Sequence, residues 1–371
     1  MKTDQDYMQL ALELAASARG NTNPNPLVGA VIVKDGVIVG TGLHRKAGEP
    51  HAEVHAVNMA GEHTKDATIY VTLEPCSHYG KTPPCAKLLK ESGFKRVVVA
   101  TEDPNPEVAG RGIRLLRDAG IEVEVGVLHE EAQKLNERFI HNMLTERPFV
   151  VAKFAMTLDG KIATYNGHSQ WITGGEARAD VHELRHEVDG ILVGVQTVLN
   201  DNPKLTTRLN ADRQGRNPIR VVLDSTLKTP VDAHIADTTE ARTIIVTSLD
   251  SDEEKAQQLE RNGVEIIRVE KEITGLHIED MLRALYKKGI THLLVEGGGN
   301  VNASFLRGGF IDQYIVYIAP KVLGGKNSIT PFTGTDVETI DLANQLEFGE
   351  VTHVGEDLRI IAYPKKAGLH D

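Results

Sequence analysis

Short β-branched runs alternate with amphipathic stretches along almost the whole sequence, and this alternation limits the possible fold more than any other feature. The run ATIYVTLEP (67–75) predicts a strand, and HAEVHAVNMAG (51–61) predicts a helix just before it. The Asp35-Gly36 pair between two apolar runs predicts a tight hairpin turn. Strands separated by helices indicate layers of helices packed on a sheet. We therefore expect an α/β fold.

The alternation falls into two series. The charged segment HEEAQKLNERFIHNMLTERP (129–148) separates them and predicts one helix that Pro148 closes. Beyond it, FVVAKFAM (149–156) and GILVGVQTVL (190–199) predict strands of a second series. A chain of 371 residues also exceeds one typical hydrophobic core. We predict a first domain over residues 1–146 and a second over residues 147–371.

Composition and charge restrict the class of protein. The chain is 40% hydrophobic and 25% charged, with a net charge of −11, which argues against general nucleic-acid binding. Leu10, Leu12 and Leu14 alternate with acidic residues, so the N-terminus reads as an amphipathic helix and not as a signal peptide. No apolar run approaches ~18 residues, so we expect no membrane span. Only two cysteines are present, and a reducing cytoplasm is the expected location.

Both cysteines lie in the segment PCSHYGKTPPC (75–85), which follows HAE at 51–53. His51, Cys76 and Cys85 match the three protein ligands of a catalytic zinc site, which keeps its fourth position for water. Glu53 is then the expected proton carrier between the water and a departing amine. We expect Cys76 to end a strand, and Cys85 to open a helix whose N-terminus favours a thiolate.

The spacing of this motif leaves alternatives open. Zinc deaminases share His-x-Glu followed by Pro-Cys-x-x-Cys, whereas eight residues separate the two cysteines here. His51 and Glu53 converge only if they open their helix, which Gly48 and Pro50 permit. The same cysteines could instead form a disulfide, or a structural zinc site with His78 or His55 as fourth ligand.

Longer motifs carry a resemblance to a known family. The matching stretches are NPNPLVGAVIV, GEPHAEVHA, TLEPCSHYGKTPPC, DPNPEVAGRGI, AKFAMTLDGKIAT, WITG, ILVGVQTVLNDNPKLTTR, VEGGGNVNASF and APKVLGG. They begin at residue 23 and cover nearly the whole chain, which closely resembles the bifunctional riboflavin-biosynthesis deaminase/reductase of bacteria. The long insert between the cysteines is that family's form of the motif.

The resemblance implies the fold and the two reactions. It implies a cytidine-deaminase-like, three-layer α/β/α N-terminal domain and a dihydrofolate-reductase-like α/β C-terminal domain. The first, with one Zn²⁺, deaminates 2,5-diamino-6-ribosylamino-4(3H)-pyrimidinone 5′-phosphate. The second uses NADPH to reduce the ribosyl group to ribityl.

The resemblance also implies contact residues in the first domain. Asn25 and His44 are expected to hold the pyrimidine and ribose, and His78, Lys81 and Asn105 the 5′-phosphate through charge-assisted hydrogen bonds. Asn25 and Asn105 flank prolines, so a turn is the competing interpretation. Lys81 is alternatively a solvated surface lysine.

In the second domain no G-x-G-x-x-G follows a first strand, so a Rossmann site is not indicated. VEGGGNVNASF instead predicts a strand, three glycines and a helix N-terminus, a combination that accepts a phosphate. The resemblance implies substrate contacts at Ser169, Arg185, Leu205, Arg208 and Glu296. It implies NADPH contacts at Ala155, Trp171, Thr197, Asp201, Ser225, Gly298, Gly299, Asn300, Val301, Asn302, Ala303 and Ser304.

Several of these residues have a plain structural alternative. Arg185 and Arg208 suit phosphate, because guanidinium binds such oxygens bidentately, but either is alternatively an exposed arginine. Hydride transfer to a C=N bond is faster when the nitrogen is protonated, and Asp201 is favoured over Lys153 for that role. Asp201 also begins a plausible turn, and Trp171 is alternatively a core residue.

Two other functions remain open from the sequence. One is a nucleoside or tRNA deaminase with an unrelated C-terminal domain. The other is a non-enzymatic, zinc-stabilised scaffold. For the bifunctional enzyme we expect a small-molecule pyrimidine ribose phosphate as partner, no nucleic acid or membrane, and a homo-oligomer.

Overall fold

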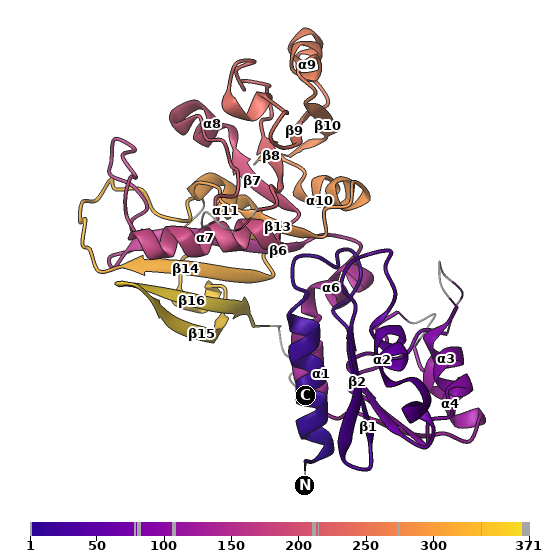
Figure 1. Cartoon of the computed structure of the whole chain (residues 1–371). Helices are drawn as coiled ribbons and strands as arrows, with labels where there is room; N and C mark the ends of the chain where they lie inside the picture. The colour runs from indigo at the N-terminus through magenta and orange to yellow at the C-terminus, as the bar shows by residue number, and fades with distance from the viewer. Residues whose placement is uncertain are drawn as a thin grey trace. The chain divides into compact units, whose positions relative to one another are not determined.

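The structure, a computed structural model, describes residues 2–77, 79, 83–105, 109–209, 213, 215–272, 275–334 and 336–365. The chain divides into two compact units, Met1–Glu146 and Arg147–Asp371, each with its own sheet (Figure 1). Within the described part of the chain, none of the helices combines the length and apolar character needed to cross a lipid bilayer.

The first unit is built on a mixed sheet with the strand order β2-β1-β3-β4-β5. β1 pairs antiparallel with β2 and β3, and the remaining pairs are parallel. Its strands are β1 (Gly29–Lys34), β2 (Val37–Leu43), β3 (Thr68–Val71), β4 (Arg96–Val99) and β5 (Glu122–Val125). Its helices are α1 (Asp4–Ala16), α2 (Ala52–Ala60), α3 (Cys85–Glu91), α4 (Arg111–Asp118), α5 (His129–Leu135) and α6 (Glu137–Thr145), with a 3₁₀ turn η1 (Gly61–Thr64).

Alternate side chains of β1 supply the two cores of this unit. Val31 and Val33 pack with Met8 of α1, while Ile32 packs with Ala56 of α2 in the other core. Helices α2, α3 and α4 cover one face of the sheet, and α1 and α5 cover the other, because successive residues of a strand point to opposite faces. The expected three-layer α/β/α arrangement, with its Asp35-Gly36 hairpin turn, is confirmed.

The single helix expected over 129–148 is wrong. Asn136 separates α5 from α6 and has backbone angles outside the helical region. Its side-chain oxygen accepts a hydrogen bond from the Leu27 N–H at 2.8 Å, and its amide donates to the Leu27 carbonyl at 2.9 Å. This buried, two-bond contact with a distant segment outweighs the local preference for an unbroken helix.

The second unit contains a larger sheet with the order β10-β9-β8-β7-β13-β6-β14-β16-β15. All neighbours are parallel except for β16, which is antiparallel to both β14 and β15. The strands are β6 (Phe149–Thr157), β7 (Gly190–Gly194), β8 (Ile219–Leu223), β9 (Thr243–Ser248), β10 (Glu265–Val269), β13 (His292–Val295), β14 (Gln313–Ala319), β15 (Leu346–Val354) and β16 (Asp357–Pro364), with a small ribbon of β11 (Lys271–Glu272) and β12 (Gly275–Leu276).

Helices cover both faces of this sheet. They are α7 (Gly175–Glu187), α8 (Val195–Asp201), α9 (Glu253–Glu260), α10 (Ile278–Lys287) and α11 (Gly299–Arg307), with 3₁₀ turns η2 (His234–Ala236) and η3 (Ile340–Leu342). One core joins α7, α8 and α9 to the sheet, and a second core joins α10 and α11 to the opposite face. Parallel strands place their carboxyl ends at one edge, where ligands of open α/β sheets bind.

Two predicted strands are too long. The strand expected over 190–199 ends at Gly194, where Val195 starts α8. The strand expected over 67–75 ends at Val71, so Cys76 lies in the following loop and not at a strand end. In both places the apolar run continues beyond the sheet, because its side chains pack against a core from a helix or a loop.

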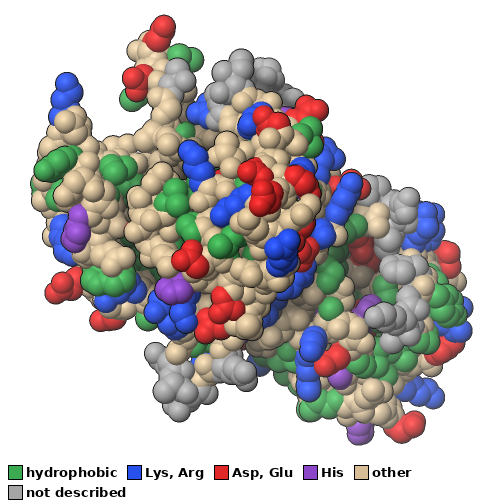
Figure 2. Space-filling view, turned by 90° about the horizontal axis from the view of Figure 1, so that it is seen from above, with side chains coloured by type: hydrophobic (Ala, Val, Ile, Leu, Met, Phe, Trp, Pro, Cys, Tyr) green, Lys and Arg blue, Asp and Glu red, His purple; other side chains and the backbone are tan. Residues whose placement is uncertain are grey.

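Charged side chains of both signs are mixed on the surface. Figure 2 shows lysine and arginine side chains interspersed with aspartate and glutamate on the face in view. Such mixing, with the net charge of −11, does not give the one-signed field that favours phosphate backbones.

Candidate active sites

Three side chains of the first unit meet in a compact cluster. The Nδ1 atom of His51 lies 3.7 Å from the Cys76 sulfur and 3.3 Å from the Cys85 sulfur. All three donor atoms lie within 4.8 Å of one another. A tetrahedral zinc ion with bonds of about 2.0–2.3 Å holds its ligand atoms about 3.5–3.8 Å apart, so this cluster fits zinc.

Helix N-termini position two of the three groups. His51 is the N-cap of α2 with extended backbone angles, and Glu53 follows in the first turn, as their convergence requires. Gly42 of β2 allows this close packing, since a Cβ there would lie 2.1 Å from the Ala52 carbonyl oxygen. Cys85 is the first residue of α3, where the helix dipole favours a thiolate.

The loop that carries Cys76 depends on a residue that the sequence reasoning missed. Glu74 is buried, and its carboxylate accepts backbone N–H bonds from Asp103, Gly110 and Gly112 at 3.2, 2.9 and 2.8 Å. These bonds tie the loop before Cys76 to the start of α4. The sequence signal was a glutamate at the end of an otherwise apolar run, where a buried carboxylate requires such donors.

The electrostatics of the cluster favour a cation. Hydrogen bonds from Cys85 and His51 lower the pKa of Cys76 to about 4 against the effect of burial, while the bond to Cys76 and burial raise the pKa of Cys85. The thiolate form is therefore favoured at Cys76 and disfavoured at Cys85, and zinc ligation by both sulfurs would require both to be deprotonated. Burial raises the pKa of Glu53 to about 7, and its Oε2 has no partner among the described residues.

The structure bears on the two competing interpretations of the cysteines, a disulfide and a structural zinc site with a fourth ligand. Cys76 and Cys85 are free, so the disulfide alternative is wrong. His55 does not belong to the donor cluster that the described residues form. His78, the other proposed fourth ligand and a predicted phosphate contact, lies outside the described residues, as does Lys81.

Two predicted pyrimidine contacts adjoin the cluster. The Asn25 amide lies 3.0 Å from His44 Nε2, and the His44 ring stands edge-on to His51 with ring centres 5.5 Å apart. Burial lowers the pKa of His44. Asn105 lies on the loop after β4, where its N–H donates to the Asp103 carboxylate at 2.9 Å, a local turn of the kind weighed for it.

A cavity of about 920 Å³ opens in the second unit at the carboxyl ends of β6, β7 and β13. It brings together residues separated by up to 180 positions in the sequence, from Lys153 to Thr333. Of the predicted contacts, those that line it are Lys153, Ala155, Ser169, Trp171, Arg185, Thr197, Asp201, Arg208, Glu296, Gly298, Gly299, Asn300 and Val301.

Three charges are paired within this cavity. Arg185 contacts both oxygens of Glu296 at 3.0 and 3.1 Å, and Lys153 Nζ lies 3.6 Å from Glu296 Oε2. Burial alone would raise the pKa of Glu296, but the two cations outweigh it and lower the pKa to about 2. Arg185 also donates to the Thr206 carbonyl at 3.2 Å, so each of its three guanidinium nitrogens makes one protein contact.

His182 is a cavity residue that the sequence reasoning missed. Its Nδ1 accepts the backbone N–H of Arg208 at 3.2 Å. Burial and the nearby Arg185 and Arg208 lower its pKa to about 4, so the ring is a neutral acceptor at neutral pH. The i, i+3 spacing from Arg185 on α7 was the available signal, since it places both side chains on one helix face.

The glycine run has the geometry of an anion-binding turn. Gly298 is the N-cap of α11 with ordinary backbone angles. A Cβ at Gly297 would lie 2.5 Å from Val301, and one at Gly299 would lie 2.7 Å from Thr333, whereas a Cβ at Gly298 would meet nothing within 4 Å. Neither packing nor backbone conformation therefore requires a glycine at Gly298. A cofactor phosphate that approaches the backbone does require one, so the turn fits NADPH.

The remaining predicted contacts of the second unit are not among the residues that line the cavity. Leu205 is packed in the hydrophobic core with a φ of 52°, and Ala303 is buried in α11. Asn302 is fully buried and donates to the Pro331 carbonyl at 2.9 Å. Ser304 bonds to the Asn300 carbonyl within α11, and Ser225 follows β8 beyond the cavity lining.

The first unit thus combines a three-layer α/β/α fold with a His-Cys-Cys donor cluster and a buried glutamate, which defines the class of zinc-dependent deaminases. Residues 1–101 match the family described as the cytidine and deoxycytidylate deaminase zinc-binding region, and residues 148–360 match the RibD C-terminal domain. The chain belongs to the RibD family, the bifunctional deaminase/reductases of riboflavin biosynthesis, which use zinc and NADPH.

Individual relatives agree over nearly the full length. The riboflavin biosynthesis protein RibD of Aquifex aeolicus is 47% identical over 96% of this chain and 97% of its own. The structure of Acinetobacter baumannii RibD has a TM-score of 0.88 at 39% identity, covering 98% of this chain and 99% of that one. A Thermotoga maritima diaminohydroxyphosphoribosylaminopyrimidine deaminase/5-amino-6-(5-phosphoribosylamino)uracil reductase has a TM-score of 0.84 at 40% identity, covering 97% and 98%.

These matches decide between the functions that the sequence left open. A deaminase with an unrelated C-terminal domain is wrong, because the second unit matches the reductase domain of the same family. A non-enzymatic scaffold is wrong as well, because the family consists of bifunctional enzymes.

Proposed function

We propose that residues 1–146 deaminate 2,5-diamino-6-ribosylamino-4(3H)-pyrimidinone 5′-phosphate and that residues 147–371 reduce the ribosyl group of the product with NADPH. The deaminase and reductase activities for which the Thermotoga maritima relative is named support this substrate. The observation that carries the proposal is the coexistence of two separately built sites, a donor cluster in one unit and a charged cavity in the other.

In the first unit His51, Cys76 and Cys85 hold the zinc ion, and Glu53 moves the protons. Zinc in such a site makes a water molecule acidic enough to act as a nucleophile near neutral pH. Glu53 takes a proton from the attacking water and delivers it to the departing 2-amino group. Its buried Oε2 supports this role, because that oxygen has no hydrogen-bond partner among the described residues. Asn25 and His44 orient the pyrimidine beside the cluster.

In the second unit the cavity residues hold an open, imine form of the ribosyl group. NADPH, when bound, would supply the hydride for the anomeric carbon, and the backbone at Gly298 and the N-terminus of α11 would hold its phosphates. Asp201, exposed in the lining, protonates the imine nitrogen. Arg208 contacts the substrate phosphate, since no protein carboxylate is paired with its guanidinium among the described contacts.

One coupled assay tests the proposal. Purified zinc-loaded protein is given the upstream pyrimidine, and ammonia release and NADPH oxidation are followed separately. We expect ammonia to appear without NADPH, and NADPH oxidation to require prior deamination. Faster ammonia release from cytidine or tRNA than from the pyrimidine phosphate would contradict the proposed substrate.

We further propose that the chain forms a homo-oligomer through β15. This strand ends the sheet order, and Leu346, Phe348 and Val351 share one of its faces according to its register with β16. Phe348 is 75% exposed and Val351 54%. An exposed apolar edge strand favours pairing with another chain. Sedimentation velocity should show a dimer or larger species, and Phe348→Lys should shift it toward the monomer.

A cytoplasmic location is proposed on the chemistry of the two cysteines. Both are free thiols close to each other, and the proposed zinc site requires them reduced. Reducing compartments maintain such thiols. Fractionation of the source cells, with ammonia release measured in each fraction, tests this location.

A further inference from the structure

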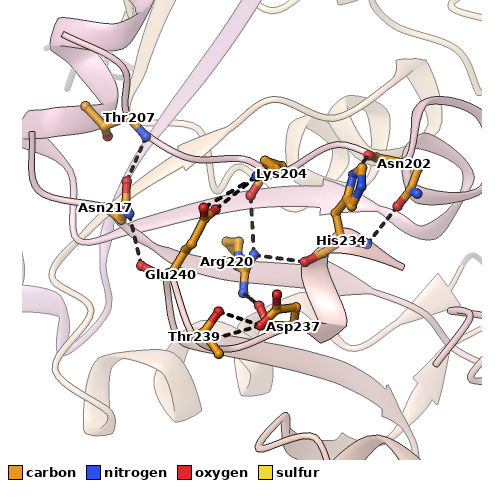
Figure 3. Close-up of polar contacts among 9 residues, drawn as sticks. All are labelled: Asn202, Lys204, Thr207, Asn217, Arg220, His234, Asp237, Thr239 and Glu240. Atoms are coloured by element: carbon orange, nitrogen blue, oxygen red, sulfur yellow. Dashed lines mark hydrogen bonds and ion pairs between the residues drawn. The ribbon is translucent and has the colours of Figure 1, made fainter. Parts of the chain in front are cut away.

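The largest fully buried side chain among the described residues is a cation. Arg220 lies on β8 and is 1% exposed. Its guanidinium contacts the backbone carbonyls of Lys204, His234 and Asp237 at 3.4, 3.3 and 2.6 Å (Figure 3). It also contacts a fourth carbonyl, that of Ala241, at 2.7 Å. A buried charge is costly unless hydrogen bonds compensate it, and an apolar side chain of similar size often stabilises a fold as well. The arginine therefore calls for an explanation beyond packing.

The four carbonyls belong to two separate segments. Lys204 lies in the extended segment 202–208 that follows α8, and the other three lie in the loop 234–241. Figure 3 shows the guanidinium between these two segments, with polar contacts on either side of it. Arg220 thus joins the segment 202–208 to the loop 234–241.

Two asparagines join the same segments at positions before and after Lys204. The Asn202 side-chain oxygen accepts the His234 N–H at 2.8 Å, and the Asn202 carbonyl lies 2.8 Å from His234 Nδ1. Asn217 accepts the Thr207 N–H at 2.9 Å and donates to the Glu240 carbonyl at 3.0 Å. The segment is therefore held at residues 202, 204 and 207, each time against the same loop.

The other side of this segment faces the reductase cavity. Asp201 immediately precedes it and Arg208 ends it, and both line the cavity. The Thr206 carbonyl accepts from Arg185, and the Arg208 N–H donates to His182, so cavity residues contact the segment from that side. The segment contains two non-glycine residues with positive φ, Asn202 at 40° and Leu205 at 52°. Such a backbone needs external contacts to keep its shape.

We propose that Arg220 is a positioning residue for the reduction step. With Asn217 it fixes the segment 202–208 on the loop 234–241, so that Asp201 and Arg208 stand at the cavity in the geometry that binds the substrate. This inference rests on the proposed reductase function. Arg220 itself does not touch the cavity lining as described.

The central test compares Arg220→Met with the native full-length protein. We expect the KM of reduction for the pre-deaminated substrate to rise about tenfold, because displacement of Arg208 by about 1 Å weakens binding strongly. Ammonia release by the same chain should stay within twofold of native. A purely structural defect would instead lower the fraction of active enzyme, which decreases apparent kcat and leaves KM unchanged.

Two further variants make the test specific. Asn217→Ala should reproduce the rise in KM, because it frees Thr207. Arg216→Met is the matched control: Arg216 also contacts backbone carbonyls, those of Glu187 and Val188, but does not touch the segment 202–208. Its KM should stay within twofold of native. On an Arg208→Ala background, Arg220→Met should raise KM by much less than tenfold, because two changes acting through one contact are not additive.

Amide hydrogen exchange gives a readout without activity. The backbone amides of Thr207 and Arg208 should exchange at least tenfold faster in Arg220→Met than in the native protein. If the native protein carries out reduction, the inference would be overturned by a KM of Arg220→Met within twofold of native. Unchanged amide exchange in segment 202–208 of this variant would also overturn it. Native protein that deaminates but does not oxidise NADPH would overturn the proposed function itself.

Discussion

The two units each bury a catalytically relevant glutamate, and the surroundings give the two carboxyl groups opposite character. Glu53 is 3% exposed, and burial raises its pKa to about 7. The side chain of Glu296 is 12% exposed, yet Arg185 and Lys153 lower its pKa to about 2. Burial favours the neutral form in both places, but only Glu296 has cations close enough to outweigh it.

This difference separates a group that moves protons from a group that holds charges in place. Glu53 keeps one oxygen without a partner among the described residues, so it can take and release a proton without breaking the fold. Glu296 uses both oxygens on Arg185. The same residue type is therefore the proposed proton carrier in one unit and the partner of two cations in the other. Identical substitutions at the two positions should have opposite consequences.

The largest expected effect is on deamination. Glu53→Gln should decrease ammonia release by about 10³-fold, because general acid–base assistance contributes roughly 10²–10⁴-fold. Zinc content, measured by atomic emission, should stay at the native level, and reduction of pre-deaminated substrate should continue. The free energy of unfolding should change by less than about 1 kcal/mol, since Oε2 has no bond to lose. Glu62→Gln, at an exposed position, is the control; equal loss of both activities would remove the distinction between the sites.

The same change at Glu296 should act mainly on stability. Glu296→Gln leaves Lys153 and Arg185 without their carboxylate and should lower the free energy of unfolding by about 3 kcal/mol at pH 7. Urea unfolding followed by Trp171, the single tryptophan, measures it. The control Glu279→Gln breaks only an exposed i, i+4 pair with Arg283 and should cost about 0.3 kcal/mol.

The pH dependence of that loss follows from the direction of the pKa shift. The folded pKa of Glu296 is about 2, below its ordinary value of 4.5, so its stabilisation is complete above pH 4.5 and disappears as the pH falls toward 2. The difference between native and Glu296→Gln should therefore shrink when unfolding is measured below about pH 4.5. A difference that stayed constant over that range would show that the two cations do not determine the state of Glu296.

Asp201→Asn should slow reduction by about 100-fold, because an amide is not acidic enough to transfer a proton to the imine nitrogen. Deamination in the same chain should not change, and Asp232→Asn, on an exposed loop outside the cavity, should leave both activities intact. Ammonia and NADPH measured in parallel check both. Full reductase activity in Asp201→Asn would contradict Asp201 as the proton donor and would favour Lys153 for that role.

The smallest effect concerns the cofactor turn. Gly298→Ala should raise the KM for NADPH about tenfold without loss of thermal stability, because its Cβ would extend only into the cavity. Gly299→Ala is the matched comparison, since its Cβ would lie 2.7 Å from Thr333 and should lower the melting temperature. Comparable melting-temperature losses in the two variants, with an unchanged KM, would contradict a phosphate at this turn.

The sequence by itself determined the fold class and the deaminase cluster. Alternation of strand and helix patterns gave the α/β layers, and β1 with its two faces confirms them. His51, Glu53, Cys76 and Cys85 were recognisable because local motifs carry them, and their short spacing restricts where their donor atoms lie. The turn at Asp35-Gly36 and the helix start at Cys85 were predictable for the same reason: neighbours in the chain decide them.

Only the tertiary structure decided what depends on distant residues. Asn136 breaks a helix because Leu27, 109 positions away, offers both a donor and an acceptor. Glu74, His182 and Arg220 owe their roles to backbone groups of other segments, which no local pattern reveals. The opposite pKa shifts of Glu53 and Glu296 have the same origin. Burial and charge pairing are properties of the folded chain, because they depend on which side chains meet in space.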